Sequence, residues 1–128
     1  MRHVALVIDG DTDARIAIAA DLRRAGLLIA ETAGRDAALR RLGAVVPNVI
    51  VLELGARKED DAELIAWLRS DERLANVPVV AVAAGAAGRA PPPGVSVLVE
   101  RPHERTELVR AVRSALRAGE DEELPSTD

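Results

Sequence analysis

The chain has 128 residues and a mass of 13.6 kDa, with 48% hydrophobic and 30% charged residues, which predicts one soluble globular domain. Cysteine is absent, so disulfides, thiolate metal sites and cysteine nucleophiles are excluded. Trp67 is the only aromatic residue, which excludes the stacking platforms used to bind single-stranded nucleic acid. The two histidines, His3 and His103, are too few for most imidazole metal sites.

The net charge of −4 is unevenly distributed. Residues 120–128 contain five acids and no base, so residues 1–119 carry a net charge of +1. We therefore predict a domain at 1–118 followed by an acidic, disordered tail at 119–128. A nearly neutral body gives no general case for nucleic-acid or membrane binding. Because no signal peptide or membrane-spanning run is visible, we expect a cytoplasmic protein.

Short aliphatic runs alternate with helical patterns along the whole chain. The clearest run is Val49–Leu54, which lies between Pro47-Asn48 and Gly55 and has the composition of a strand buried on both faces. We predict strands at 4–8, 27–31, 49–54, 78–83 and 95–99.

The connections between these runs show helical periodicity, which predicts helices at 12–25, 34–42, 60–69 and 105–117. Asp11 or Thr12 is expected to cap the first helix, and Gly26 to end it. The residues expected to face the core are Ile16, Ala19, Ala20 and Leu22 or Arg23; Ala37, Ala38 and Leu42; Leu64, Ile65 and Leu68; and Leu108, Val112 and Leu116.

The connection at 84–94 differs from the others, because its three prolines and its glycines argue against a regular helix. The expected helix between strands four and five is therefore shortened or lost. Five strands joined by right-handed crossovers predict an α/β doubly wound parallel sheet of the flavodoxin-like kind, whose strand order is 2-1-3-4-5.

Charged residues stand where several of these strands end. Asp9 follows the first strand, Glu53 lies at the end of the third and Arg101 follows the fifth, while Ala83 ends the fourth. Because the carboxyl ends of parallel strands form one edge, we expect these residues, with Asp11 as a further candidate, to lie close together. Clustered carboxylates either bind a hard cation such as Mg²⁺ or repel one another and take up protons.

From about residue 3 to residue 118 the chain resembles the receiver domain of two-component response regulators. The resemblance implies a Mg²⁺ site at an acid pair after strand one and a phosphoacceptor aspartate after strand three. It also implies a hydroxyl residue after strand four and a lysine before a cis-proline. The matching segments are Val7-Ile8-Asp9, Pro47–Leu54, Glu63-Leu64, Val77–Val80 and Arg101-Pro102.

The chain departs from the receiver pattern at nearly every chemical position. Asp9 keeps the first acid and Pro102 is the cis-proline candidate. The departures are Gly10 for the second acid, Glu53 for the phosphoacceptor, Ala83 for the hydroxyl residue, Arg101 for the lysine, Leu98 for an aromatic switch residue and Asp61 for a glycine before helix three. We expect a remnant phosphoacceptor pocket made of Asp9, Gly10, Glu53, Ala83 and Arg101. The metal ligand, the phosphoacceptor and the switch relay have changed together.

The sequence therefore predicts a pseudo-receiver, a signalling or adaptor module that binds another protein of a bacterial pathway without being phosphorylated. We expect no enzyme activity, no cofactor and no catalytic residue, and a homodimer is one possible assembly. No output domain follows the last helix, so the chain is expected to act as a free adaptor or to be a fragment. In the pocket, we hypothesise that Glu53 and Arg101 form an ion pair with Asp9 as a second acceptor.

Three alternatives remain open. The first is a weakly phosphorylatable receiver, and the second is weak Mg²⁺ binding by Asp9 and Glu53. The third is a small Mg²⁺-dependent phosphatase, because Asp9-Gly10-Asp11-Thr12 resembles the first motif of haloacid-dehalogenase-type phosphatases. Ala83 and Asp13 depart from that pattern.

Three surface features have both a functional and a purely structural interpretation. Trp67 is either an anchor for a partner or a large residue packed on the surface of its helix. The stripe of Arg110, Arg113 and Arg117 is either a nucleic-acid patch or a solvated face. The prolines at 91–93 are either a polyproline ligand or a rigid connection. The structural interpretation is favoured for all three.

Overall fold

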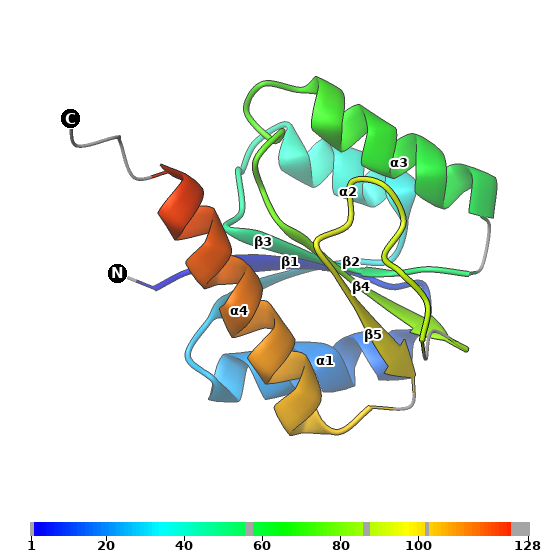
Figure 1. Ribbon diagram of the computed structural model, residues 1–128, viewed down its shortest axis with the longest axis vertical. Coiled ribbons are helices and arrows are strands. Elements are labelled where there is room, and N and C mark those ends of the chain that lie inside the picture. The colour runs from blue at the N-terminus through cyan, green and yellow to red at the C-terminus, as the bar shows by residue number, and fades with distance from the viewer. Residues whose placement is uncertain (1, 56–57, 86–87, 102, 124–128) are drawn as a thin grey trace.

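The computed structural model describes residues 2–55, 58–85, 88–101 and 103–123. Their strands form one parallel sheet in the order β2-β1-β3-β4-β5, which confirms the predicted flavodoxin-like fold (Figure 1). The strands are β1 (Val4–Ile8), β2 (Leu28–Thr32), β3 (Val49–Glu53), β4 (Val79–Ala84) and β5 (Val97–Arg101).

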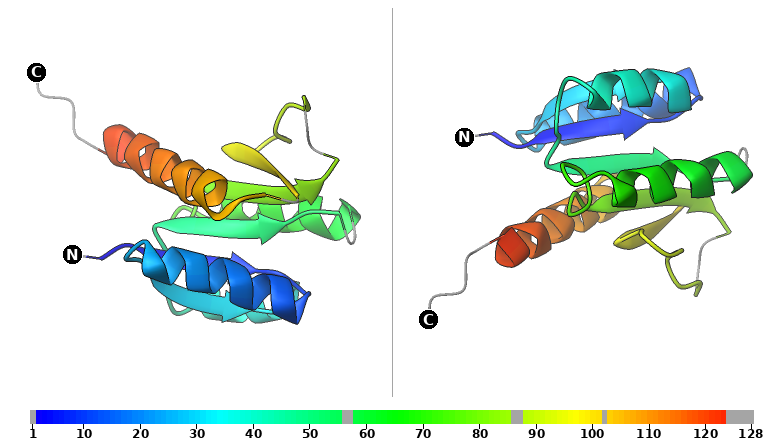
Figure 2. Two further views of the ribbon diagram at one scale, coloured as in Figure 1. Left: turned by 90° about the horizontal axis from the view of Figure 1, so that it is seen from below. Right: turned by 90° about the horizontal axis from the view of Figure 1, so that it is seen from above.

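Helices cover both faces of the sheet. One face packs against α2 and α3, and the other packs against α1 and α4, as the two opposite views of Figure 2 show. This arrangement follows from right-handed crossovers between parallel strands. The helices are α1 (Thr12–Arg24), α2 (Arg35–Leu42), α3 (Lys58–Ser70) and α4 (Arg105–Glu123).

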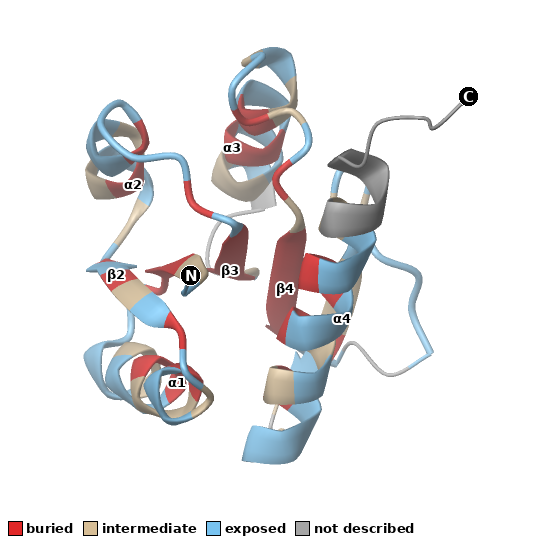
Figure 3. Cartoon of the chain, turned by 90° about the vertical axis from the view of Figure 1, so that its left-hand side faces the viewer, coloured by how far each residue is buried: buried red, intermediate tan, exposed pale blue. Residues whose placement is uncertain are grey.

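The three central strands are buried on both faces, so their side chains divide between two apolar cores (Figure 3). In β3, Val49 and Val51 join the core beneath α1 and α4, whereas Ile50 and Leu52 join the core beneath α2 and α3. The nearly continuous aliphatic runs of the sequence are explained by this double burial. The inward residues predicted for the third and last helices, Leu64, Ile65, Leu68, Leu108, Val112 and Leu116, are all buried.

The predicted stripe of the first helix is partly wrong. Ile16 is 54% exposed, and Ile18 takes its place in the core together with Ala19 and Leu22. The physical reason lies one residue earlier, because the half-buried Arg15 turns toward the sheet and donates from Nη1 to the carbonyl oxygen of Asp9 at 2.9 Å. The predicted cap is confirmed, since the Asp11 side chain accepts a hydrogen bond from the Ala14 N–H at 3.0 Å.

Three elements have ends that differ from the predictions by two residues or more. β5 begins at Val97, two residues later than predicted, and α3 begins at Lys58, so that Asp61 lies inside its first turn and not before it. α4 continues past the predicted end at 117 to Glu123, so residues 119–123, which we assigned to a disordered tail, are helical. Glutamate favours helix, and the first proline after Gly119 is Pro125, so nothing in the sequence ends the helix at 118. Residues 124–128 lie outside the described residues.

The connection between β4 and β5 contains no helix in its described residues, 85 and 88–96, as predicted. Arg69 of α3 holds this connection in place, because its Nη2 and Nε donate to the carbonyl oxygen of Gly94 at 2.6 and 3.1 Å. Its Nη1 donates to the carbonyl oxygens of Ala75 and Val77, both at 2.8 Å. Gly94 has a φ of +84°, and a Cβ there would lie 2.6 Å from Cγ2 of Ile65, so the position requires glycine.

The outer surface of α3 carries Trp67, which is 36% exposed. This exposure is compatible with both an anchor for a partner and a residue packed on its helix.

No helix within the described ranges is long and apolar enough to cross a membrane. The apolar surface of the described helices is instead directed mainly at the sheet, which leaves only single large hydrophobic residues exposed, such as Ile16 on α1.

Candidate functional site

The predicted pocket residues gather at the carboxyl edge of the sheet. Asp9 follows β1 directly, Glu53 is the last residue of β3 and Arg101 is the last residue of β5. Ala83 lies on β4, one residue before Ala84, which pairs with Arg101 in the parallel register. The structure thus brings together residues that are up to 92 positions apart in the sequence. The cis-proline candidate Pro102 lies outside the described residues.

Asp9 is the centre of this site. It is 2% exposed, and its N–H donates to the carbonyl oxygen of Thr32 at 3.1 Å, which fixes its backbone against β2. Oδ1 accepts a hydrogen bond from the Asp11 N–H at 2.9 Å, and Oδ2 accepts one from Nη2 of Arg101 at 3.3 Å. Each oxygen of the buried carboxylate therefore has a donor, as a buried charge requires.

Glu53 shares a hydrogen bond with the side chain of Asp9, and this raises its pKa to about 7. Burial and the negative charge of Asp9 raise the pKa of Glu53 further, whereas the positive charge of Arg101 opposes the increase. The Glu53 carboxyl group thus keeps its proton up to about neutral pH. The side chain at the phosphoacceptor position is therefore engaged with an acid of its own chain.

The hypothesised ion pair between Glu53 and Arg101 is not the one in the structure. Arg101 pairs with Asp9, with Nη2 and Oδ2 3.3 Å apart, and Glu53 is instead hydrogen-bonded to Asp9. The reason is burial: the Asp9 side chain is 1% exposed, so it has the greater need of a cation, while the Arg101 side chain keeps 32% of its surface in water. Asp9, which the hypothesis gave as the second acceptor, is therefore the acid that pairs with Arg101.

Two further pocket positions carry no chemical group. A Cβ at Gly10 would lie 3.4 Å from the carbonyl oxygen of Ala33, which is an ordinary contact, and Gly10 is not among the glycines with positive φ. Glycine is therefore not required there by the backbone or by packing, yet the second acid is absent. Ala83 is 8% exposed and presents a methyl group where the receiver pattern has a hydroxyl.

The candidate ligands for a Mg²⁺ ion at this edge already have partners within the chain. Of the two candidate ligands, Asp9 has both carboxylate oxygens engaged by hydrogen-bond donors, and Glu53 holds a proton near neutral pH. Gly10 contributes no oxygen ligand from a side chain. Within the part of the chain that the structure describes, no group of three or more acids or histidines is placed to hold a metal ion.

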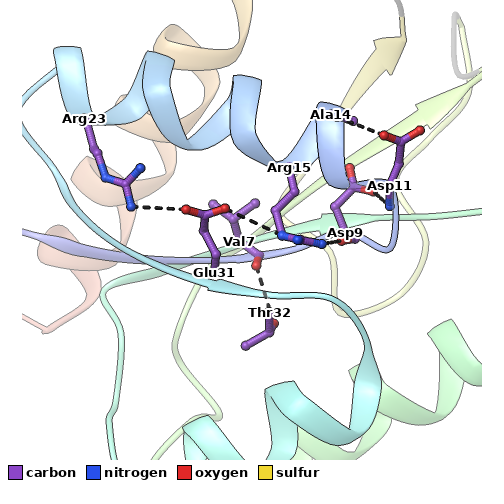
Figure 4. Close-up of polar contacts among 8 residues, drawn as sticks. All are labelled: Val7, Asp9, Asp11, Ala14, Arg15, Arg23, Glu31 and Thr32. Carbon is purple, nitrogen blue, oxygen red and sulfur yellow. Dashed lines mark hydrogen bonds and ion pairs between the residues drawn. The ribbon is translucent and has the colours of Figure 1, made fainter.

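A network behind Asp9 was missed by the sequence reasoning (Figure 4). Arg15 contacts the carbonyl oxygen of Asp9 and also lies 3.6 Å from Glu31, through its Nε and the glutamate Oε1. Arg23 lies 3.2 Å from the second oxygen of Glu31. The only signal in the sequence was indirect: helical spacing puts the two arginines on α1, and the parallel register puts Glu31 beside Val7 on β1.

Next to the site lies a hollow of about 1000 Å³ over β4 and β5, on the α3 side. A crossover helix would cover this part of the sheet in a complete doubly wound fold. Its walls include Glu53, Arg101, Leu98 and Asp61. Oδ2 of Asp61 accepts a hydrogen bond from the Gly55 N–H at 3.0 Å, and partial burial raises the pKa of this carboxyl group.

Solved structures of response regulators, receiver domains and related signalling proteins superimpose on 90% or more of the chain. Their sequence identities to the chain are below 25%, so the similarity establishes a receiver-like fold and no more. No protein-family model matches the chain, and no curated protein matches it.

Three solved structures illustrate the similarity. A sensor protein from Polaromonas sp. JS666 has a TM-score of 0.82 and 22% identity, with 93% of this chain and 99% of that chain covered. A putative response regulator from Chloroflexus aurantiacus J-10-fl has a TM-score of 0.81 and 22% identity, with 91% and 99% covered. NtrX from Brucella abortus has a TM-score of 0.83 and 23% identity, and the match covers 95% of this chain but 28% of NtrX.

Proposed function

We propose that this chain is a receiver-like signalling module that acts by binding another protein and does not accept a phosphoryl group. The observation that carries the proposal is the bonding of Asp9, whose buried carboxylate is held by Arg101 and shares a hydrogen bond with Glu53. The acid at the acceptor position and the cation at the phosphate-binding position are thus both engaged within the chain.

The same bonding explains why the substitutions occur together. An arginine offers several donors from one planar group and keeps its charge at any physiological pH, so it stays beside Asp9 without a ligand. Glu53 is one methylene longer than aspartate and reaches Asp9. Phosphoryl transfer would need a free carboxylate nucleophile, a bound cation and a hydroxyl donor, and Ala83 does not supply the last of these.

The signalling role in this proposal comes from the class of fold, and the dependence on a protein partner comes from the loss of the site's chemistry. The two alternatives, a weakly phosphorylatable receiver and a small Mg²⁺-dependent phosphatase, both need a reactive acid at this edge. Asp11 is the second acid of the phosphatase-like motif, and its side chain caps α1. The phosphatase alternative would need this acid as its proton donor.

Intact mass spectrometry after incubation with Mg²⁺ and acetyl phosphate tests the proposal. We expect no mass increase corresponding to a phosphoryl group, and no release of inorganic phosphate above the rate without protein. A phosphoryl adduct on Glu53 or Asp9 would replace the proposal with the weakly phosphorylatable receiver. Catalytic release of phosphate that disappears in Asp9→Asn would favour the phosphatase.

A further inference from the structure

A cleft of about 580 Å³ is lined by the end of α1 and by α4. Both helices lie on the face of the sheet opposite α3 (Figure 2). Ala25 and Val109, both half-buried against the core, contribute its apolar surface. Its charged lining is one-sided, with five arginines and a single acid, Asp21. The arginines are Arg24, Arg105, Arg110, Arg113 and Arg117.

Most of this positive charge is not neutralised within the chain. Arg24 lies 3.9 Å from Asp21, and Arg113 donates from Nη2 to the carbonyl oxygen of Ala25 at 3.5 Å. Among the described residues, no acid lies within 4.0 Å of the guanidinium groups of the other three, Arg105, Arg110 and Arg117. Five guanidinium groups around one short cleft repel one another, so the cleft gains stability from an anionic occupant.

The helix that carries four of these arginines continues beyond them. Residues 120–123 are acidic in sequence and extend α4 past Arg117 as one helix. Their backbone therefore follows the helix and does not turn back over the cleft. Among the described residues, the backbone thus brings no acidic segment of the chain into the cleft, and we look for the occupant in another protein.

Nucleic acid fits the cleft less well than a polypeptide does. Residues 1–119 carry a net charge of only +1, and exposed Glu104 and Glu107 lie at the start of the same helix, so a long polyanion would soon meet negative charge. The only aromatic residue, Trp67, is on the opposite side of the sheet, so the cleft offers no aromatic ring on which a base could stack.

We propose that the cleft between α1 and α4 binds a short acidic segment of a partner protein. The segment from Arg105 to Arg117 spans roughly 18 Å at 1.5 Å per residue, which matches about six residues of an extended peptide. Carboxylates of such a peptide pair with guanidinium groups in the fork geometry that arginine favours, while an apolar side chain between them contacts Ala25 and Val109. The inference rests on the proposed function for the idea that the chain works through a protein partner, and it adds the chemistry of that partner.

Fluorescence anisotropy with the full chain tests the inference. The probe is a fluorescein-labelled oligoglutamate of about eight residues, with oligoglutamine of the same length as the neutral control. The test variant is Arg110→Gln with Arg117→Gln, and the matched control is Arg40→Gln with Arg41→Gln, which removes the same charge from exposed positions of α2. Circular dichroism and the melting temperature verify that both variants are folded.

We expect oligoglutamate to bind, oligoglutamine not to bind, and the dissociation constant to rise about tenfold in the α4 variant but not in the α2 variant. Binding should weaken between about 50 and about 300 mM NaCl. Equal loss in both variants, or no binding of oligoglutamate, would overturn the inference. Tighter binding of a DNA duplex through the same arginines would also overturn it, as would self-association that requires residues 120–128. The proposed function is tested by the mass of the chain after incubation with a phosphodonor, and the acidic-peptide site is tested by anisotropy. The failure of one proposal is therefore distinguished from the failure of the other.

Discussion

The central strands are held by apolar packing, whereas the edge at which they end is held by specific polar contacts. Along β1, β3 and β4 the side chains are aliphatic and almost completely buried, and any set of similar volume would keep the sheet between its two helix layers. One residue further, Asp9 depends on particular donors at particular distances. The difference teaches that the receiver fold is carried by packing that does not involve the edge. The polar residues of the edge can therefore change without loss of the fold.

A truncation inside the sheet should have the largest effect. Ile50 of β3 is 0% exposed, so Ile50→Ala should lower the free energy of unfolding by about 3 kcal/mol through lost apolar contacts and a cavity. Leu28 of β2 is 48% exposed and provides the control, with an expected loss below about 1 kcal/mol for Leu28→Ala. Urea denaturation measures both, and equal losses would show that burial in the sheet does not govern stability.

Removal of the cation at the edge should have a smaller effect. Arg101→Ala leaves the buried carboxylate of Asp9 without its charged partner and should cost about 1–3 kcal/mol in the free energy of unfolding. Arg40→Ala, at an exposed arginine of α2, should change the same quantity by less than about 0.5 kcal/mol. If the two substitutions have the same effect by urea denaturation, the pair between Arg101 and Asp9 does not support the folded state.

The smallest effect should be a pH dependence that comes from Glu53. Its pKa is raised to about 7, so the folded chain keeps a proton that the unfolded chain releases above its ordinary pKa of 4.5. The stabilisation from this proton is complete below pH 4.5 and is lost as the pH rises through 7. Glu53→Gln should therefore flatten the fall in unfolding free energy between about pH 5 and about pH 8. Parallel curves for the natural chain and the variant would show that the pKa of Glu53 is not raised in the folded chain. Because Glu53 is only partly buried, solvent screening keeps this effect modest.

The sequence predicted the scaffold well because its signals are local and repeated. Aliphatic runs placed all five strands within two residues of their observed ends, and the prolines before Gly94 predicted the lost helix. It also predicted which residues meet at the edge, since the ends of parallel strands converge.

The sequence could not predict which partner each polar group takes. Arg101 pairs with Asp9 and not with Glu53 because Asp9 is the more deeply buried of the two acids, and burial is a property of the folded chain. In the same way, Arg15 contacts the Asp9 carbonyl oxygen from the inward side of α1, whereas Ile16 is exposed. Arg69 was assigned no role, although it holds the connection that replaces a helix. Such contacts depend on where the partners lie in the folded chain and leave no periodic signal in the sequence.

The central claim is that the residues at the carboxyl edge of the sheet do not accept a phosphoryl group. The most direct test compares two proteins in one phosphodonor experiment. One is the natural chain, and the other carries Gly10→Asp, Glu53→Asp, Ala83→Thr and Arg101→Lys, which return the pocket to the receiver pattern. After incubation with Mg²⁺ and acetyl phosphate, intact mass spectrometry should find a phosphoryl adduct on the substituted chain and none on the natural chain. An adduct on the natural chain would contradict the account, and so would two unmodified chains, because these four positions would then not be what closes the site.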